Sequence, residues 1–163
     1  MKGTRNRIWC VRALLAMAAV GVGGAVALAD DAATHGEVLI VLAKEEAGEI
    51  DPALKDMPAL RRPPFSAFKS MKLLGRPPIS LVPKKPTEVD LPNGRKLQII
   101  LESTLPDGRF RVRVSINRPE KKDYLPLLQV IASPGDPFFV AGQSHQGGTL
   151  VIGVRVGDKP AKP

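Results

Sequence analysis

The chain is poor in the side chains on which many catalytic and disulfide-stabilised proteins depend. It contains one Cys, two His, one Trp and one Tyr, and aromatic residues make up only 4% of it. A single Cys excludes an internal disulfide framework. No His-x-x-x-His or Cys-x-x-Cys pair occurs, so the usual spacing of a zinc site is absent. Few aromatic rings are left to stack on bases, which argues against nucleic acid as a partner.

The first 29 residues have the three parts of a secretory signal peptide. Basic residues open the chain, an uncharged apolar stretch covers residues 13–29, and Ala27-Leu28-Ala29 supplies a small-x-small cleavage pattern. The stretch of 17 residues is at the lower limit for a membrane span. Cys10 precedes it, so lipid attachment is not expected. We expect export by the general secretory route, cleavage after Ala29 and a periplasmic or extracellular location without a stable membrane anchor. A signal retained as an anchor is the alternative.

Half of the chain's basic excess belongs to this signal. Cleavage removes four basic residues and no acidic one, so the net charge falls from +8 to +4. The remaining charge is uneven: residues 30–54 carry a net −6, residues 55–122 carry a net +10, and residues 57–87 contain no acid. A basic surface outside the cytoplasm predicts an anionic partner, such as an envelope protein or an anionic envelope polymer. The alternative is a solvated surface that pairs partly with the acidic N-terminal segment.

Short apolar runs separated by Pro and Gly predict a mainly all-β domain over residues 30–156. Its expected strands cover the ranges 38–42, 79–82, 88–91, 96–102, 109–116, 127–132, 138–141 and 149–156. Residues 65–74 fit a strand or a helix, and we favour a strand. Asp51-Pro52 predicts a short helix near residues 52–60. We expect a single antiparallel β-sandwich or partly open barrel of about seven to nine short strands, and a disordered tail at residues 157–163.

Two of these ranges have distinctive patterns. Five successive apolar residues at 38–42 predict a strand covered on both faces. Residues 109–116 alternate strictly, with apolar side chains on one face and Arg109, Arg111, Arg113 and Ser115 on the other. These three arginines are candidates for a surface that binds an anionic partner. The acid-free stretch adds Arg61, Arg62, Lys69, Lys72, Lys84 and Lys85 to the candidates.

Residues 142–148 are rich in Gly and predict a flexible hairpin loop. Gln143, Ser144, His145 and Gln146 form a candidate contact site there, since loops often carry binding. Neighbouring side chains of an extended segment point apart, so Ser144 and His145 are not expected to act as a catalytic pair. We assign no catalytic, metal-binding or cofactor-binding residue.

These features predict an exported, soluble protein of a bacterial envelope that acts as a binding, accessory or assembly module. We expect neither an enzyme nor a bound cofactor. Two alternatives stay open. One is a small exported hydrolase or metal-binding protein whose site is built from scattered His and carboxylate groups. The other is a structural subunit of a cell-envelope assembly, which would expose unpaired sheet edges or an apolar patch.

Overall fold

The computed structural model describes residues 32–118 and 123–158. The expected signal peptide, residues 1–29, lies outside the described residues. The same is true of residues 159–163 in the expected C-terminal tail.

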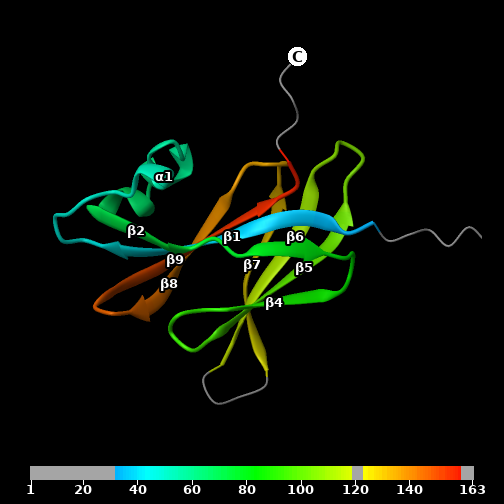
Figure 1. The fold of residues 1–163 in the computed structure, drawn as a ribbon. Helices are drawn as coiled ribbons and strands as arrows, with labels where there is room; N and C mark the ends of the chain where they lie inside the picture. Colours follow the sequence, from blue (N-terminus) through cyan, green and yellow to red (C-terminus); the bar gives the residue numbers. More distant parts are fainter. Residues whose placement is uncertain (1–31, 119–122, 159–163) are drawn as a thin grey trace, which may run out of the picture. The chain divides into compact units, whose positions relative to one another are not determined.

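Within the described residues, nine strands form two antiparallel sheets. Sheet A has the order β2-β1-β9-β8, with β3 also paired to β1, and sheet B has the order β4-β5-β6-β7 (Figure 1). The strands of sheet A are β1 (Thr34–Lys44), β2 (Ser70–Gly75), β3 (Pro78–Leu81), β8 (Phe138–His145) and β9 (Gly148–Val156). Those of sheet B are β4 (Pro86–Asp90), β5 (Lys96–Thr104), β6 (Phe110–Asn117) and β7 (Tyr124–Ala132). The arrangement is a sandwich and not a closed barrel, which resolves the alternative that the sequence left open.

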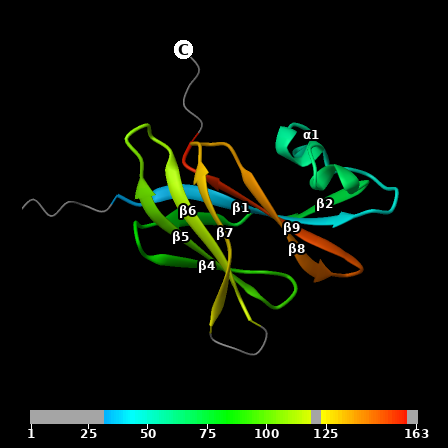
Figure 2. The ribbon, with the colours of Figure 1, turned by 180° about the vertical axis from the view of Figure 1, so that it is seen from behind.

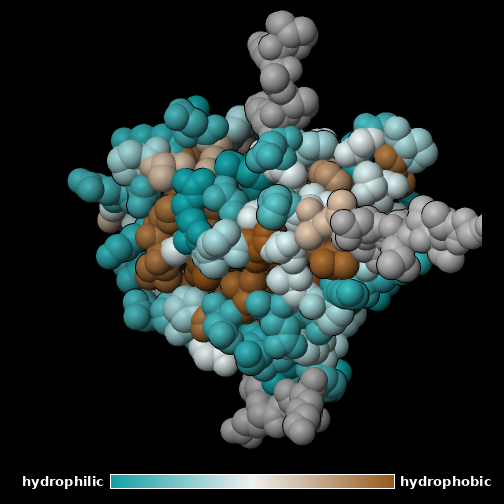
Figure 3. Space-filling model, turned by 45° about the vertical axis from the view of Figure 1, so that its right-hand side comes forward, coloured by the Kyte–Doolittle hydropathy of each residue, from teal (hydrophilic) through white to brown (hydrophobic). Residues whose placement is uncertain are grey.

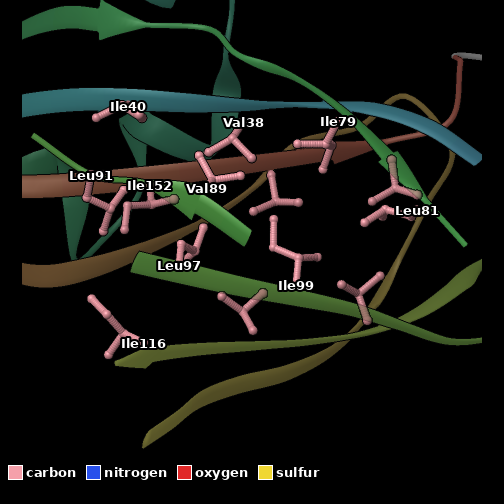
Figure 4. Close-up of a cluster of buried hydrophobic side chains, with 14 of the residues drawn as sticks. Val38, Ile40, Ile79, Leu81, Val89, Leu91, Leu97, Ile99, Ile116 and Ile152 are labelled. Carbon is pink, nitrogen blue, oxygen red and sulfur yellow. The ribbon is translucent and has the colours of Figure 1, made fainter. Parts of the chain in front are cut away.

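The main hydrophobic core lies between the two sheets. Sheet A contributes Val38, Ile40 and Ile152, among others, and sheet B contributes Leu97 and Ile99 (Figure 4). These residues recur at every second position of their strands, so each strand presents one apolar face to the other sheet. Ile99, Leu97 and Val38 are fully buried. The alternation seen in the sequence is therefore the alternation that builds the sandwich.

A second, smaller core covers the outer face of sheet A. It forms where a helical segment, made of α1 (Pro52–Lys55), η1 (Pro58–Arg61) and η2 (Phe65–Ala67), packs on the sheet. The buried members of this core are Leu39, Val41, Ala43, Leu54, Met57, Leu60, Met71 and Val151. Both ribbon views show the helical segment beside β2, away from sheet B (Figures 1 and 2). Because residues 38–43 are buried throughout, the expected strand with two covered faces is confirmed.

Two hairpin turns of sheet B form at sequences typical of turns, Pro92-Asn93-Gly94 and Pro106-Asp107-Gly108. The Gly94 N–H donates to the Leu91 carbonyl between β4 and β5, and the Gly108 N–H donates to the Leu105 carbonyl between β5 and β6. Both glycines have φ near +80°, a region that a Cβ disfavours. The short helix also lies where Asp51-Pro52 predicts it, and the Asp51 carboxylate accepts the Ala53 N–H at 2.9 Å.

Three local expectations need correction. Of residues 65–74, the first three form a 3-10 turn and only the part from Ser70 onward is a strand. The expected loop 142–148 is mostly strand: β8 crosses a bulge at Gly142 and runs to His145. Ser115 lies on the outer face of sheet B but is buried (6% exposed), whereas the alternation predicts a wet position. Ser115 pairs in register with Pro126 of β7 and with Gln98 of β5. With a neighbour on each side, its short side chain has little surface exposed to water.

The loop prediction was wrong for a definite reason. The glycines that suggested flexibility have fixed roles, because Gly142 with φ +132° makes the bulge possible. Gln146 and Gly147, with φ of +46° and +73°, close the hairpin as a two-residue turn. Positive φ at both central residues is the geometry that twisted antiparallel strands favour. Three of the four candidate contact residues therefore belong to β8, and only Gln146 lies in the turn.

Candidate functional site

Carboxylates largely compensate the arginine row, which consists of Arg109 and of Arg111 and Arg113 on β6. Arg109 donates to Asp107, with an Nη2–Oδ2 distance of 2.6 Å, and this hydrogen bond holds the pKa of Asp107 below its ordinary value. Arg113 forms an ion pair with Glu102 on β5. Arg111 is exposed, and among the described residues no ion pair to it is found. The row thus offers one uncompensated charge in place of the three that alternation suggests.

The candidates from the acid-free stretch behave differently. Arg61, Arg62, Lys69, Lys72, Lys84 and Lys85 are all exposed. No carboxylate within the described part of the chain forms an ion pair with any of them. Among the seven basic residues of this stretch, only Arg76 is paired, with Glu37. Within the described residues, the acidic segment near the N-terminus therefore forms no ion pair with these six side chains.

The six residues do not form one surface. Leu81 pairs with Thr34 at one end of β1, and Ser70 pairs with Lys44 at the other end. Ten residues of strand separate these ends, which corresponds to about 30 Å. Lys84 and Lys85 follow Leu81, so they lie far from Lys69.

Lys72 is set apart in another way. It follows Met71, which is buried in the second core. Neighbouring residues of a strand point to opposite faces, so the Lys72 side chain points away from the helical segment.

Of the remaining cations, Arg61 and Arg62 lie at the end of η1, and Lys69 lies between η2 and β2. We call Lys55, Arg61, Arg62 and Lys69 the basic helical face; all four side chains are exposed. Asp56 is the one acid between residues 52 and 69. Sequence reasoning missed Lys55, because the acid-free stretch begins only after Asp56. Residues 52–69 thus carry four cations against one acid, and Asp51, which caps α1, and Glu49, whose carbonyl accepts from the Met71 N–H, lie at the edge of the same segment.

A cavity opens at this face. It measures about 320 Å³ and is lined by Ile50, Leu54, Lys55, Leu60, Arg61, Ser66, Phe68 and Met71. Five of the eight residues are hydrophobic and none is acidic. Arg61 reaches across the segment and donates to the Lys55 carbonyl, which fixes its guanidinium near the α1 end. We call this space the helical cavity.

An ion-paired centre on sheet A was not foreseen from the sequence. Glu37 accepts from Arg76 (Nη2–Oε1, 2.7 Å) and from Arg155 (Nη1–Oε1, 2.7 Å). The hydrogen bond to Glu37 raises the pKa of Arg76. Arg76 and Arg155 are 39 and 118 positions from Glu37 in sequence, and the pairing of β1 with β3 and with β9 brings them to it. The Arg155 Nε is buried without a hydrogen-bond partner in the structure.

Two further cavities lie outside the helical cavity, and one of them contains a candidate residue. One of about 560 Å³ is lined by Asp56, Asp136, Arg155 and Asp158, among others, so its walls carry both charges. Another of about 480 Å³ includes Ser144 from the candidate contact site together with Glu45 and Glu46. Gln143, His145 and Gln146 do not line it.

The described residues contain no group of three or more His, Cys, Asp or Glu side chains placed to hold a metal ion. No helix in residues 32–118 or 123–158 is long and apolar enough to cross a membrane. Four large hydrophobic side chains remain more than a third exposed: Ile50, Leu74, Leu125 and Ile131. Hydrophobic patches between hydrophilic residues are also visible on the face shown in Figure 3.

Comparisons of the chain with protein-family models, with curated proteins and with solved structures give no significant match.

Proposed function

We propose that this protein is an exported binding module that holds an anionic partner of a bacterial envelope on the basic helical face. One observation carries the proposal: the cations of this face are exposed and free of ion pairs within the described residues, whereas Arg109 and Arg113 are paired. An exposed unpaired cation attracts a polyanion without first giving up an internal partner. A paired arginine must first be separated from its carboxylate.

The second core supports this role by fixing the face on the sheet. Leu54, Met57 and Leu60 belong to the helical segment and are buried in the second core. Their burial holds the short helical turns in place, since helices of this length are not stable alone. The charges are thus carried by a packed segment and not by a free chain, which lowers the entropy cost of binding.

The test compares two variants that lose the same charge from different surfaces. Arg62→Gln/Lys69→Gln removes two cations of the basic helical face, and Arg109→Gln/Arg113→Gln removes two cations of the arginine row. Binding to dextran sulfate, a soluble polyanion, is measured by isothermal titration calorimetry on the purified protein. With about 1 kcal/mol per basic residue at an anionic surface, the first variant should bind about thirtyfold more weakly.

The second variant serves as the matched control and should bind within about threefold of the unmodified protein, because its two charges are already compensated. Equal losses in both variants would show that binding follows net charge alone. A larger loss in the control would assign binding to the arginine row. Either result overturns the proposal for the basic helical face.

A further inference from the structure

The helical cavity is lined by apolar residues that have no role in the proposed binding of a polyanion. Its inner wall is apolar, from Leu54, Leu60, Phe68 and Met71, while Lys55 and Arg61 supply two cations. Polymer binding needs exposed charge, and it has no need of a hollow lined by hydrophobic residues. The combination of an apolar pocket with a few placed polar groups is typical of sites for small molecules.

We infer that the helical cavity binds a single-chain anionic amphiphile, such as a fatty acid, with the chain inside the cavity and the carboxylate at Lys55 and Arg61. This inference shares Lys55 and Arg61 with the basic helical face of the proposed function, but it rests on the cavity, and the variants that test it differ from those that test polyanion binding. The charged side chains that line the cavity are all cationic, since no Asp or Glu is among them. A carboxylate at this position would therefore meet the two cations Lys55 and Arg61 of the cavity lining.

The size of the cavity selects a single chain. A volume of about 320 Å³ holds about ten groups of the size of a water molecule, each of which occupies about 30 Å³ in the liquid. A methylene group is similar in size, so one acyl chain of about ten carbons fits. The two chains of a phospholipid would need about three times this space.

The entrance is also suited to an apolar chain. Ile50 lines the cavity and is 39% exposed, so it presents an apolar side chain to water beside the cavity. Met71, which pairs with Ile50 in a β-bridge, also lines the cavity, is 3% exposed and belongs to the second core. The cavity thus has an exposed isoleucine beside a buried methionine, and a flexible methionine side chain adapts readily to a ligand.

Dodecanoate is the probe, and its binding to the purified protein is measured by isothermal titration calorimetry below its micellar concentration. We expect one binding site. Butanoate, which has the same charge without the chain, should show no detectable binding. Dodecyltrimethylammonium, which has the same chain with the opposite charge, should bind at least tenfold more weakly. No dodecanoate binding, or equal binding of the cationic amphiphile, would refute the inference.

Variants locate the site. Ser66→Trp places a large side chain from the exposed η2 turn at the cavity and should abolish binding. Arg61→Gln should weaken dodecanoate binding about tenfold. Arg111→Gln, which removes an exposed and unpaired cation from β6, is the matched control and should bind like the unmodified protein.

Circular dichroism checks that each variant folds, and Ser66→Leu replaces Ser66→Trp if the tryptophan variant does not. Full binding by a folded Ser66 variant would place the ligand elsewhere and overturn the inference. The same holds if Arg61→Gln and Arg111→Gln reduce binding equally.

Discussion

The attachment of the helical segment to sheet A depends on the absence of a side chain at Gly153. The glycine lies on the central strand β9, in register with Leu39 of β1 and Phe139 of β8. A Cβ at this position would lie 2.5 Å from the Phe139 Cε1 atom and 3.2 Å from the Leu39 Cβ. Phe139 in turn packs edge-to-face on Phe65 of the helical segment, with 6.0 Å between ring centroids. The ring therefore sits over the glycine and connects sheet to helical segment.

Gly153→Ala should force the Phe139 ring away from this position. Because the φ of Gly153 lies outside the left-handed region, the backbone itself accepts alanine, and the cost comes from the clash. Overpacking of this kind costs about 1–3 kcal/mol. For a domain of this size, 2 kcal/mol corresponds to a fall in Tm of about 8 °C. Replacing the ring with a smaller side chain, by Phe139→Leu, should recover part of the stability lost in Gly153→Ala.

The assay is urea unfolding of the two single variants and the double variant. Circular dichroism is the suitable signal, because the one tryptophan, Trp9, lies outside the described residues. We expect the double variant to be about 1–2 kcal/mol more stable than the sum of the single effects predicts. Additive effects, or a Gly153→Ala variant as stable as the unmodified protein, would refute the account of this contact.

Two further predictions concern ion pairs and hydrogen bonds. Tyr124 is the one tyrosine of the chain, and its hydroxyl donates to Glu88 at 2.7 Å, which raises the pKa of the phenol above its ordinary value. An ultraviolet titration should show the raised pKa of Tyr124, and Glu88→Gln should lower it. The hydrogen bond contributes its full stability at a pH below the pKa of tyrosine in the unfolded chain. This stability is lost as the pH rises through the pKa of Tyr124 in the folded protein. Glu37→Gln removes the shared acceptor of two arginines and should reduce the free energy of unfolding by about 1–2 kcal/mol in urea, since Arg76 is partly exposed. Glu46→Gln, which removes an exposed carboxylate with no ion pair among the described residues, is its control, and an equal loss in both would contradict the role given to Glu37.

Local features of the fold could be predicted from the sequence where one short stretch determines the result. Apolar and polar residues alternate over 110–114, which form a strand, and the apolar run at 38–42 forms a strand with both faces buried. In each case the pattern of apolar residues indicates which side chains are buried. Pro, Asn, Asp and Gly likewise determine the turns at 92–94 and 106–108. The sandwich could not be distinguished from a barrel, since that depends on which strands close the sheet edges.

The candidate site could be predicted only in part. The sequence locates the charges of Arg109 and Arg113, but it does not show that Asp107 and Glu102 compensate them. Bulges shift the register by one residue, and cross-strand partners are set by register. The helical cavity was missed because its walls come from a strand, a helix and a 3-10 turn that meet only in the fold.

The salt dependence of dextran sulfate binding tests the central claim most directly. If the basic helical face holds the polyanion, a plot of log Kd against log salt concentration should lose about 1–2 units of slope in Arg62→Gln/Lys69→Gln, because two counterion-releasing contacts are gone. The Arg109→Gln/Arg113→Gln variant should keep the slope of the unmodified protein. An unchanged slope in the first variant, or the same reduction in both, would contradict the account.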